Sequence, residues 1–221
     1  MSIKQLREMT GAGLMDCKKA LEAAGNDIEK ALVILKEKGI AKAQKRSNNL
    51  ANEGAIFIVE SDTSYVMLNI GTETDFVAKN DHFCSEILKE AVKFAKNNQN
   101  DILNEEFNQQ LAMLSATMGE NILLKDAFKF VKSSQAIVET YIHNHLNANF
   151  LNIGKIGVVV AANLDIDREI LKNIALHIAS FKPNSIEELN EQCYLMDNKL
   201  TVAKFCQIHS INIADFRVFS I

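Results

Sequence analysis

Residues 54–70 read GAIFIVESDTSYVMLNI. Residues 54–59 are apolar, residues 65–70 are apolar except for Asn69, and the polar residues 61–64 separate the two runs. Short runs of β-branched and aromatic residues joined by a polar turn predict a β-hairpin. Beyond it, apolar residues recur at the spacing of one helix face, at Phe83, Ile87, Ala91 and Phe94. We therefore expect the core to begin with a hairpin followed by a helix.

The same order of elements recurs later in the chain. Residues 136–143 predict a strand, and residues 156–162 predict its buried partner. A helix follows from about Asp167, because apolar residues again lie at helical spacing, at Ile170, Ile174, Ile178 and Phe181. We therefore expect an α+β core of two related halves, 54–135 and 136–200, each with an antiparallel hairpin and a helix.

The elements outside these hairpins are simpler. Between them we expect a helix near 107–118 and a strand near 122–131. A last helix has its apolar stripe at Val202, Phe205, Cys206 and His209. With a strand over 216–221, it makes 201–221 a C-terminal segment of one helix and one strand.

Residues 1–39 predict a separate unit of three helices. A glycine-rich loop ends the short first helix, and the second carries the stripe Leu14, Cys17, Leu21 and Ala24. Either Asn26 or Asp27 caps the third helix, which we expect Gly39 to end. Residues 40–53 lack a sustained apolar stripe and are interpreted as a linker, either helical or irregular.

The 221 residues have the composition of an ordinary globular protein, with 48% hydrophobic residues and a net charge of −4. The apolar content is too high for a disordered chain, and the longest apolar run is far short of a membrane span. The first 50 residues carry ten Lys and Arg against six Asp and Glu. No aromatic residue precedes Phe57, so this basic segment lacks stacking platforms for single-stranded nucleic acid. We expect neither a membrane nor a nucleic acid as partner.

Candidate catalytic groups are few. His143 and His145 lie on one face of a strand and are either part of a metal site or a polar strand end; a structural zinc takes four ligands, and no third is evident. Asp165 and Asp167 precede a helix, where acids cap free N–H groups. The four cysteines form no CxxC pair, which indicates reduced thiols in a cytosolic protein. We expect no metal, no cofactor and no enzyme activity.

Two segments have features that packing alone does not readily explain, and one histidine allows two interpretations. Met15 falls outside the apolar stripe beside a tight turn, and an exposed Met is an adaptable contact group. In the segment 74–80, either Asp75 caps a helix and Phe76 fills the core, or the pair serves another purpose. His177 lies on an apolar helix face, as a core histidine or as a partner contact.

Taken together, these segments resemble those of bacterial translation elongation factor Ts. The first of two specific signatures is matched by Leu6-Arg7-Glu8, Thr10-Gly11-Ala12-Gly13 and Met15-Asp16-Cys17-Lys18-Lys19-Ala20-Leu21. The second is matched by Thr74-Asp75-Phe76-Val77-Ala78-Lys79-Asn80. The similarity extends over essentially the whole chain, through Gly119-Glu120-Asn121-Ile122, Tyr141-Ile142-His143, His177-Ile178-Ala179, Lys182-Pro183 and Phe216-Arg217-Val218.

The resemblance implies a guanine nucleotide exchange factor of translation elongation. Members of this family bind elongation factor Tu carrying GDP, promote release of GDP and magnesium, and hold the empty form until GTP binds. The nucleotide is bound by the partner alone. The expected compartment is the bacterial cytoplasm, ahead of an organelle matrix.

The resemblance also implies which residues meet the partner. The N-terminal unit, similar to a ubiquitin-associated domain, docks on the GTP-binding domain through Arg7, Leu14, Met15 and Lys18, with Cys17 in its core. The second contact is the segment Thr74, Asp75, Phe76, Val77, Ala78, Lys79 and Asn80, whose Asp-Phe pair intrudes beside the magnesium and phosphate site. His177 lies in the second core half, which faces the partner as well.

The chain departs from the family pattern in three places. Residues 123–126 read Leu-Leu-Lys-Asp where two arginines are usual, and the loop 144–153 is longer than expected. A protruding helical hairpin that many members carry after the equivalent of Pro183 is expected to be absent, as in shorter members. Two other classes are left open: an adaptor, which has no use for an Asp-Phe intrusion, and a metal-dependent hydrolase that uses the two strand histidines.

Overall fold

The computed structural model describes residues 3–96 and 105–221. The chain divides into two compact units. The helical unit comprises Met1–Gly54, Gly71–Ala78 and Asp101–Leu124. The sheet unit comprises Ala55–Ile70, Lys79–Asn100 and Lys125–Ile221. Each unit has a hydrophobic core of its own.

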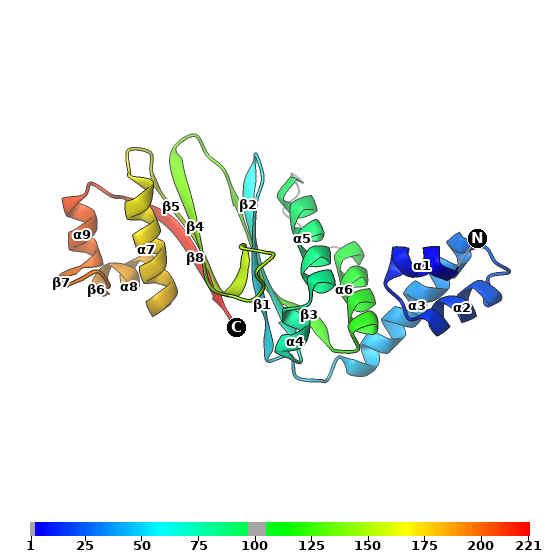
Figure 1. Cartoon of the computed structure of the whole chain (residues 1–221). Helices are drawn as coiled ribbons and strands as arrows, with labels where there is room; N and C mark the ends of the chain where they lie inside the picture. Colours follow the sequence, from blue (N-terminus) through cyan, green and yellow to red (C-terminus); the bar gives the residue numbers. More distant parts are fainter. Residues whose placement is uncertain (1–2, 97–104) are drawn as a thin grey trace. The chain divides into compact units, whose positions relative to one another are not determined.

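Three helices open the helical unit: α1 (Ile3–Thr10), α2 (Leu14–Ala23) and α3 (Ile28–Arg46) (Figure 1). Asp27 caps α3, because its side chain accepts a hydrogen bond of 3.1 Å from the backbone N–H of Lys30. The helices enclose a small core of Leu6, Cys17, Ala20, Leu21, Ala31 and Leu35. The predicted three helices and the Asp27 cap are confirmed.

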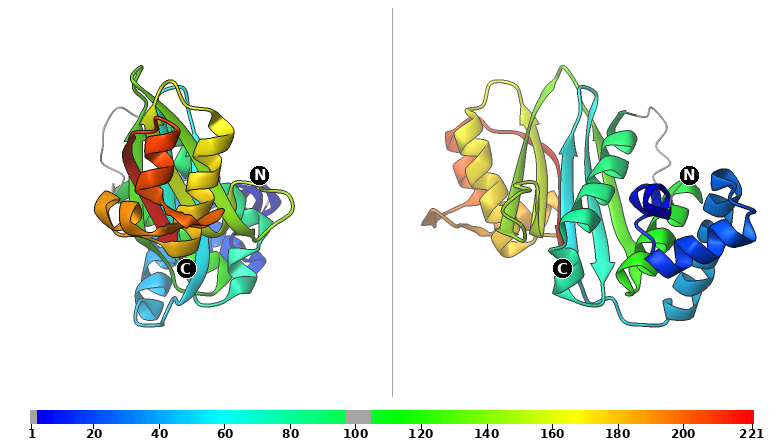
Figure 2. Two further views of the ribbon diagram at one scale, coloured as in Figure 1. Left: turned by 90° about the vertical axis from the view of Figure 1, so that its left-hand side faces the viewer. Right: turned by 45° about the vertical axis from the view of Figure 1, so that its right-hand side comes forward.

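The prediction that Gly39 ends the third helix is wrong. Helix α3 continues through Gly39 to Arg46, so half of the expected linker is helical. The same helix packs along α6 (Glu105–Met118) (Figure 2). A Cβ atom at Gly39 would lie 2.9 Å from the Sδ atom of Met113 on α6. The glycine therefore permits a close approach of two helices instead of ending one.

The sheet unit contains the order strand, strand, helix twice. The first copy is β1 (Glu53–Glu60), β2 (Ser64–Thr72) and α5 (Asp81–Lys96). The second copy is β4 (Ala136–His145), β5 (Ile153–Asn163) and α7 (Arg168–Phe181). Two further strands are β3 (Ile122–Val131) and β8 (Ile213–Ser220). The predicted twofold pattern is confirmed, and β8 begins three residues earlier than expected.

The two hairpins share a single sheet. Its order is β3-β2-β1-β5-β4, and β8 pairs with β5 as well. Strand β5 is antiparallel to both of these neighbours: it pairs with β4 over 154–163 and with β8 over 156–162. Its pairing with β1 is confined to Ile56 opposite Gly154 and Phe57 opposite Ile153. The two halves are therefore joined through the first residues of β5.

The single sheet curls so that its two parts face each other. The order of layers in the sheet unit is therefore a helix, one part of the sheet, the other part of the sheet and a second helix (Figures 1 and 2). Met67 of β2 and Val159 of β5 belong to one buried cluster between the two parts of the sheet. Val160, on the opposite face of β5, packs in the cluster under α7. Helix α5 covers β1 and β2 from outside, where the rings of Phe57 and Phe83 meet edge to face with centroids 5.8 Å apart.

The segment after α7 forms short elements, of which only the last helix was predicted. They are α8 (Ile186–Glu191), β6 (Cys193–Tyr194), β7 (Asp197–Thr201) and α9 (Val202–Ile208). Residues 182–201 are all described and contain no long helical hairpin, as expected. Among the described helices, none has the length and apolar character to cross a bilayer.

Candidate partner-binding site

The predicted docking residues of α1 and α2 lie on the surface. Helix α2 buries Cys17 in the core, whereas the Leu14 and Met15 side chains are 56% and 60% exposed. Two neighbouring apolar side chains therefore face solvent at the start of α2. Arg7 is exposed in the last turn of α1, and the Lys18 ammonium lies 3.9 Å from the carboxylate of Glu22. The prediction that Met15 lies outside the core is confirmed.

An ion pair connects α2 and α3. The Lys42 ammonium donates to the Asp16 carboxylate at 2.9 Å. This hydrogen bond holds the pKa of Asp16 below its usual range, with Lys38 and Lys19 adding to the positive field. Met9 on α1 is a further exposed apolar residue. Sequence reasoning missed it, because so short a helix has no clear apolar stripe from which a residue could deviate.

The second predicted segment carries the most exposed aromatic side chain found among the large hydrophobic residues described. Phe76 is 82% exposed in the short helix α4 (Asp75–Ala78), whereas Val77 and Ala78 are buried. The alternative in which Phe76 fills the core is therefore wrong. An apolar ring in water gains no burial free energy from its position in the free chain.

The residue before α4 is held by an acidic side chain from another part of the helical unit. The carboxylate of Glu120 accepts a hydrogen bond of 2.9 Å from the backbone N–H of Thr74, and its other oxygen accepts from the Thr74 hydroxyl. Sequence reasoning did not select Glu120 as a site residue. Its only signal was the Gly119-Glu120-Asn121-Ile122 match to the family.

Glu73 forms a second set of hydrogen bonds, next to those between Glu120 and Thr74. Its carboxylate accepts from the side-chain amide of Asn49 at 3.0 Å and from the backbone N–H of Asn121. These hydrogen bonds hold the pKa of Glu73 below its usual range, and the charge of Arg46 acts in the same direction. The Asn121 amide in turn donates to the carbonyl of Asn49 at 2.8 Å. The stretches around residues 49, 73 and 121 are thereby connected.

The last two residues of the predicted segment have structural partners. The Asn80 side chain caps α5, accepting from the backbone N–H groups of His82 and Phe83 at 3.0 and 3.1 Å. The amide of Asn147, in the unexpectedly long loop, donates to the Lys79 carbonyl at 2.9 Å and to the Asp81 carboxylate at 2.6 Å. This loop therefore fixes the start of α5.

His177 has the environment of a core histidine. Its side chain is fully buried, its Nε2 lies 3.0 Å from the Gln192 amide oxygen, and its Nδ1 accepts from the backbone N–H of Leu195 at 3.1 Å. Burial holds its pKa below the usual range. The ring offers no accessible surface to a partner, so we leave it out of the exposed site.

The groups considered for catalysis do not converge. The His143 Nδ1 lies 3.0 Å from the Tyr141 hydroxyl, and within the two described ranges no three His, Cys, Asp or Glu side chains gather as metal ligands. Asp167 caps α7 through the backbone N–H of Glu169, as predicted. Burial raises the pKa of the Cys84 thiol to about 12, which removes the reactive thiolate at neutral pH.

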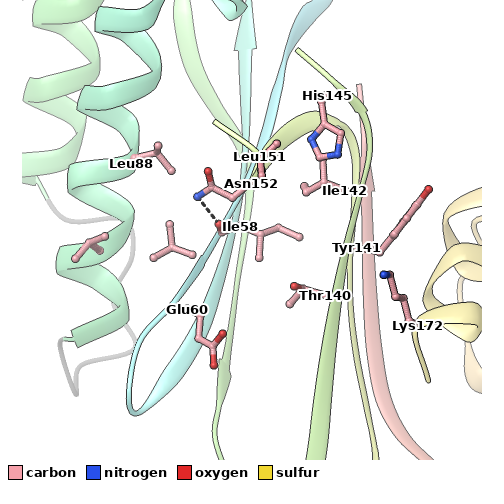
Figure 3. Close-up of a pocket in the computed structure, with 12 residues that line it drawn as sticks. Ile58, Glu60, Leu88, Thr140, Tyr141, Ile142, His145, Leu151, Asn152 and Lys172 are labelled. Carbon is pink, nitrogen blue, oxygen red and sulfur yellow. Dashed lines mark hydrogen bonds between the residues drawn. The ribbon is translucent and has the colours of Figure 1, made fainter. Parts of the chain in front are cut away.

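A cavity of about 590 Å³ opens between β1 and β4 in the sheet unit (Figure 3). Its lining is mixed, with Leu88 from α5, Leu151 from the long loop, His145 and, at one end, Glu60. The Glu60 carboxylate is already occupied by the Lys132 ammonium at 2.6 Å and the Tyr65 hydroxyl at 2.9 Å. These groups form no nucleophile and base pair, so the cavity has no evident catalytic chemistry.

Comparison with known proteins agrees with the resemblance in the sequence. The family model described as "Elongation factor TS" matches residues 73–190. Elongation factor Ts of Nitratiruptor sp. is 34% identical over 217 residues, which cover 91% of this chain and 68% of that protein. The protein of the same name from Methylorubrum extorquens is 35% identical over 84% of this chain and 63% of its own length.

A third relative, elongation factor Ts of Aliarcobacter butzleri, is 40% identical over 83% of this chain and 54% of its own length. The chain thus spans between about half and two thirds of the length of these relatives. The family match covers the exposed Phe76 segment and the chain from α5 through α7. This chain belongs to the elongation factor Ts family.

Proposed function

We propose that this chain is a guanine nucleotide exchange factor for elongation factor Tu. It binds the GDP complex, promotes release of GDP and magnesium, and holds the nucleotide-free form until GTP binds. The observation that carries the proposal is Phe76, an 82% exposed aromatic ring on a segment whose neighbouring residues are anchored. We propose the bacterial cytoplasm as the compartment, in keeping with the sources of the relatives.

The proposed mechanism rests on linkage. A protein that binds the empty form of its partner more tightly than the GDP form must weaken GDP binding by the same factor. Asp75 and Phe76 would occupy space beside the partner's magnesium and phosphate site. Since magnesium neutralises the phosphates, its loss weakens the hold on the nucleotide. The chain itself supplies shape and charge, and it makes or breaks no covalent bond.

The free energy needed to weaken GDP binding requires more than one contact with the partner. Burial of a Phe side chain supplies about 1.5–3 kcal/mol. A thousandfold weakening of GDP needs roughly 4 kcal/mol, at about 1.4 kcal/mol per tenfold. Phe76 alone is therefore insufficient, and docking through Leu14 and Met15 must add to it. These exposed residues and Phe76 all belong to the helical unit.

Release of labelled GDP from elongation factor Tu, with and without this chain, tests the proposal. We expect release to accelerate with chain concentration and then to saturate, because each exchange passes through a complex. A chain that binds the partner without accelerating release would be an adaptor, and the proposal would fail. Metal analysis of the purified protein tests the hydrolase alternative separately.

A further inference from the structure

The backbone that carries Phe76 is fixed at Thr74, two residues before the ring. Glu120 accepts from the N–H and from the hydroxyl of Thr74, and the Thr72 hydroxyl donates to the Thr74 carbonyl at 2.7 Å. All three polar groups of Thr74 are thereby engaged. On the other side of the ring, Val77 and Ala78 are buried. Phe76 is thus an exposed side chain on an immobilised stretch of backbone.

Glu120 is itself held in place. It follows Gly119, whose φ of +79° lies in the left-handed region that favours glycine. The Glu120 carbonyl accepts from the hydroxyl of the buried Ser115, one turn back on α6. The next residue, Asn121, donates its backbone N–H to Glu73. The carboxylate therefore projects from a turn that is fixed by α6 on one side and by Glu73 on the other.

We propose that Glu120 is a positioning residue for Phe76. The proposal rests on the exchange function proposed above and assigns a part of it to a side chain that does not touch the nucleotide. A ring on a mobile loop would lose conformational freedom when it binds, and this loss subtracts from affinity. By fixing Thr74 in the free chain, Glu120 removes that loss before the partner arrives.

Substitutions at Glu120 and Thr74 can remove one or both of the hydrogen bonds between them. Glu120→Ala removes both hydrogen bonds to Thr74. Glu120→Gln keeps a carbonyl oxygen for the Thr74 N–H, and its amide N–H can donate to the Thr74 hydroxyl, which accepts as well as donates. Thr74→Val removes the hydroxyl and keeps the N–H, whereas Thr74→Ser keeps both. Glu191→Ala, at an exposed acid in the last turn of α8, is the matched control for loss of a carboxylate.

The first experiment is a double-mutant cycle on GDP release from elongation factor Tu. We expect Glu120→Ala to slow maximal release about tenfold, and Glu120→Gln and the control to stay within about twofold of the unaltered chain. In the Phe76→Ala background, Glu120→Ala should cause almost no further loss, since there is no ring to position. Independent, multiplicative effects of the two substitutions would overturn the proposal.

The second experiment does not depend on the partner. Hydrogen exchange of the free, full chain should show a protected Thr74 amide, which becomes exposed in Glu120→Ala and protected again in Glu120→Gln. Equal protection in all three would overturn the proposal. If the unaltered chain fails to release GDP, the exchange function is refuted while this measurement still tests the positioning. If Glu120→Ala does not fold, Thr74→Val against Thr74→Ser gives the same comparison.

Discussion

Phe76 is a side chain that can contribute to binding without contributing to the stability of the free chain. Because the ring is largely in water in the free chain, its removal costs little folding free energy. Its burial in a complex, in contrast, is worth about 1.5–3 kcal/mol. A residue with this combination contributes to binding alone. The same reasoning applies to Met15 and in the opposite sense to His177.

Phe76→Ala is expected to leave the melting temperature unchanged and to slow GDP release from elongation factor Tu. The loss should lie between about tenfold and a hundredfold, from the area that the ring buries on binding. Thermal unfolding and labelled-GDP release measure the two effects. Phe83→Ala, at a buried ring, is the matched control and should lower the melting temperature strongly. Unaltered release by Phe76→Ala would rule out the ring as a contact.

Met15→Asp is expected to weaken complex formation with elongation factor Tu and to leave folding intact. The side chain is exposed, so a charge there costs the free chain little, but it must be desolvated in an apolar contact. Titration calorimetry and thermal unfolding measure both properties. Ala20→Asp, on the buried side of the same helix, should instead destabilise the fold. A large drop in melting temperature for Met15→Asp would argue against this assignment.

The free energy of unfolding is expected to decrease as the pH is lowered, and part of this decrease depends on His177. Burial lowers its pKa in the folded state, so the unfolded chain takes up the proton first, near pH 6.5. The contribution is present above about pH 6.5 and is lost as the pH falls below it. Urea unfolding at several pH values should show a shallower decline for His177→Gln than for the unaltered chain.

Helix α3 shows why element boundaries are harder to predict than elements. Gly39 and the lack of an apolar stripe after it are typical of a helix end, but packing on α6 extends the helix to Arg46. Local propensity differs by only about 1 kcal/mol between glycine and alanine, so a buried contact with another helix outweighs it. The partner helix lies about 70 residues away in the sequence and leaves no local signal.

Gly39→Leu is expected to destabilise the protein although leucine is the better helix former. A Cβ atom at this position would lie 2.9 Å from the Met113 sulfur, so the larger side chain must displace the Met113 side chain or α6. Overpacking of this kind costs about 1–3 kcal/mol, more than the propensity gain. Urea unfolding measures the loss, and the added substitution Met113→Ala should restore part of it. A Gly39→Leu chain as stable as the original would show that α3 and α6 do not pack closely.

Most of the sheet unit could be predicted from the sequence, because its strands and helices have regular apolar patterns. The hairpin of β6 and β7 was missed, since two to five mostly exposed residues per strand carry no periodicity. The exposed site residues were found through family signatures. Their supports, Glu120 and Asn147, were not, because a hydrogen bond between residues more than 45 positions apart has no local pattern.

At the scale of the whole molecule, the excess of Lys and Arg is confined to the N-terminal segment. The first 50 residues, with their excess of Lys and Arg, all belong to the helical unit, whereas the rest of the chain is acidic. A basic surface next to exposed Leu14 and Met15 favours an acidic partner surface and accelerates the encounter with it. The same surface has no aromatic platforms, in keeping with a protein partner rather than a single-stranded nucleic acid.

The short pairing of β1 with β5 has a consequence for the time course of folding during synthesis. Ile56 can pair with Gly154 only after nearly a hundred further residues have been synthesised. At about 5–20 residues per second, this synthesis takes about 5–20 s. The β1–β2 hairpin forms within about 1–10 μs, but an isolated hairpin is marginally stable. One edge of β1 therefore stays open on the ribosome for seconds. The rate of peptide elongation, the process in which this chain is proposed to act, sets how long its own unfinished sheet is exposed.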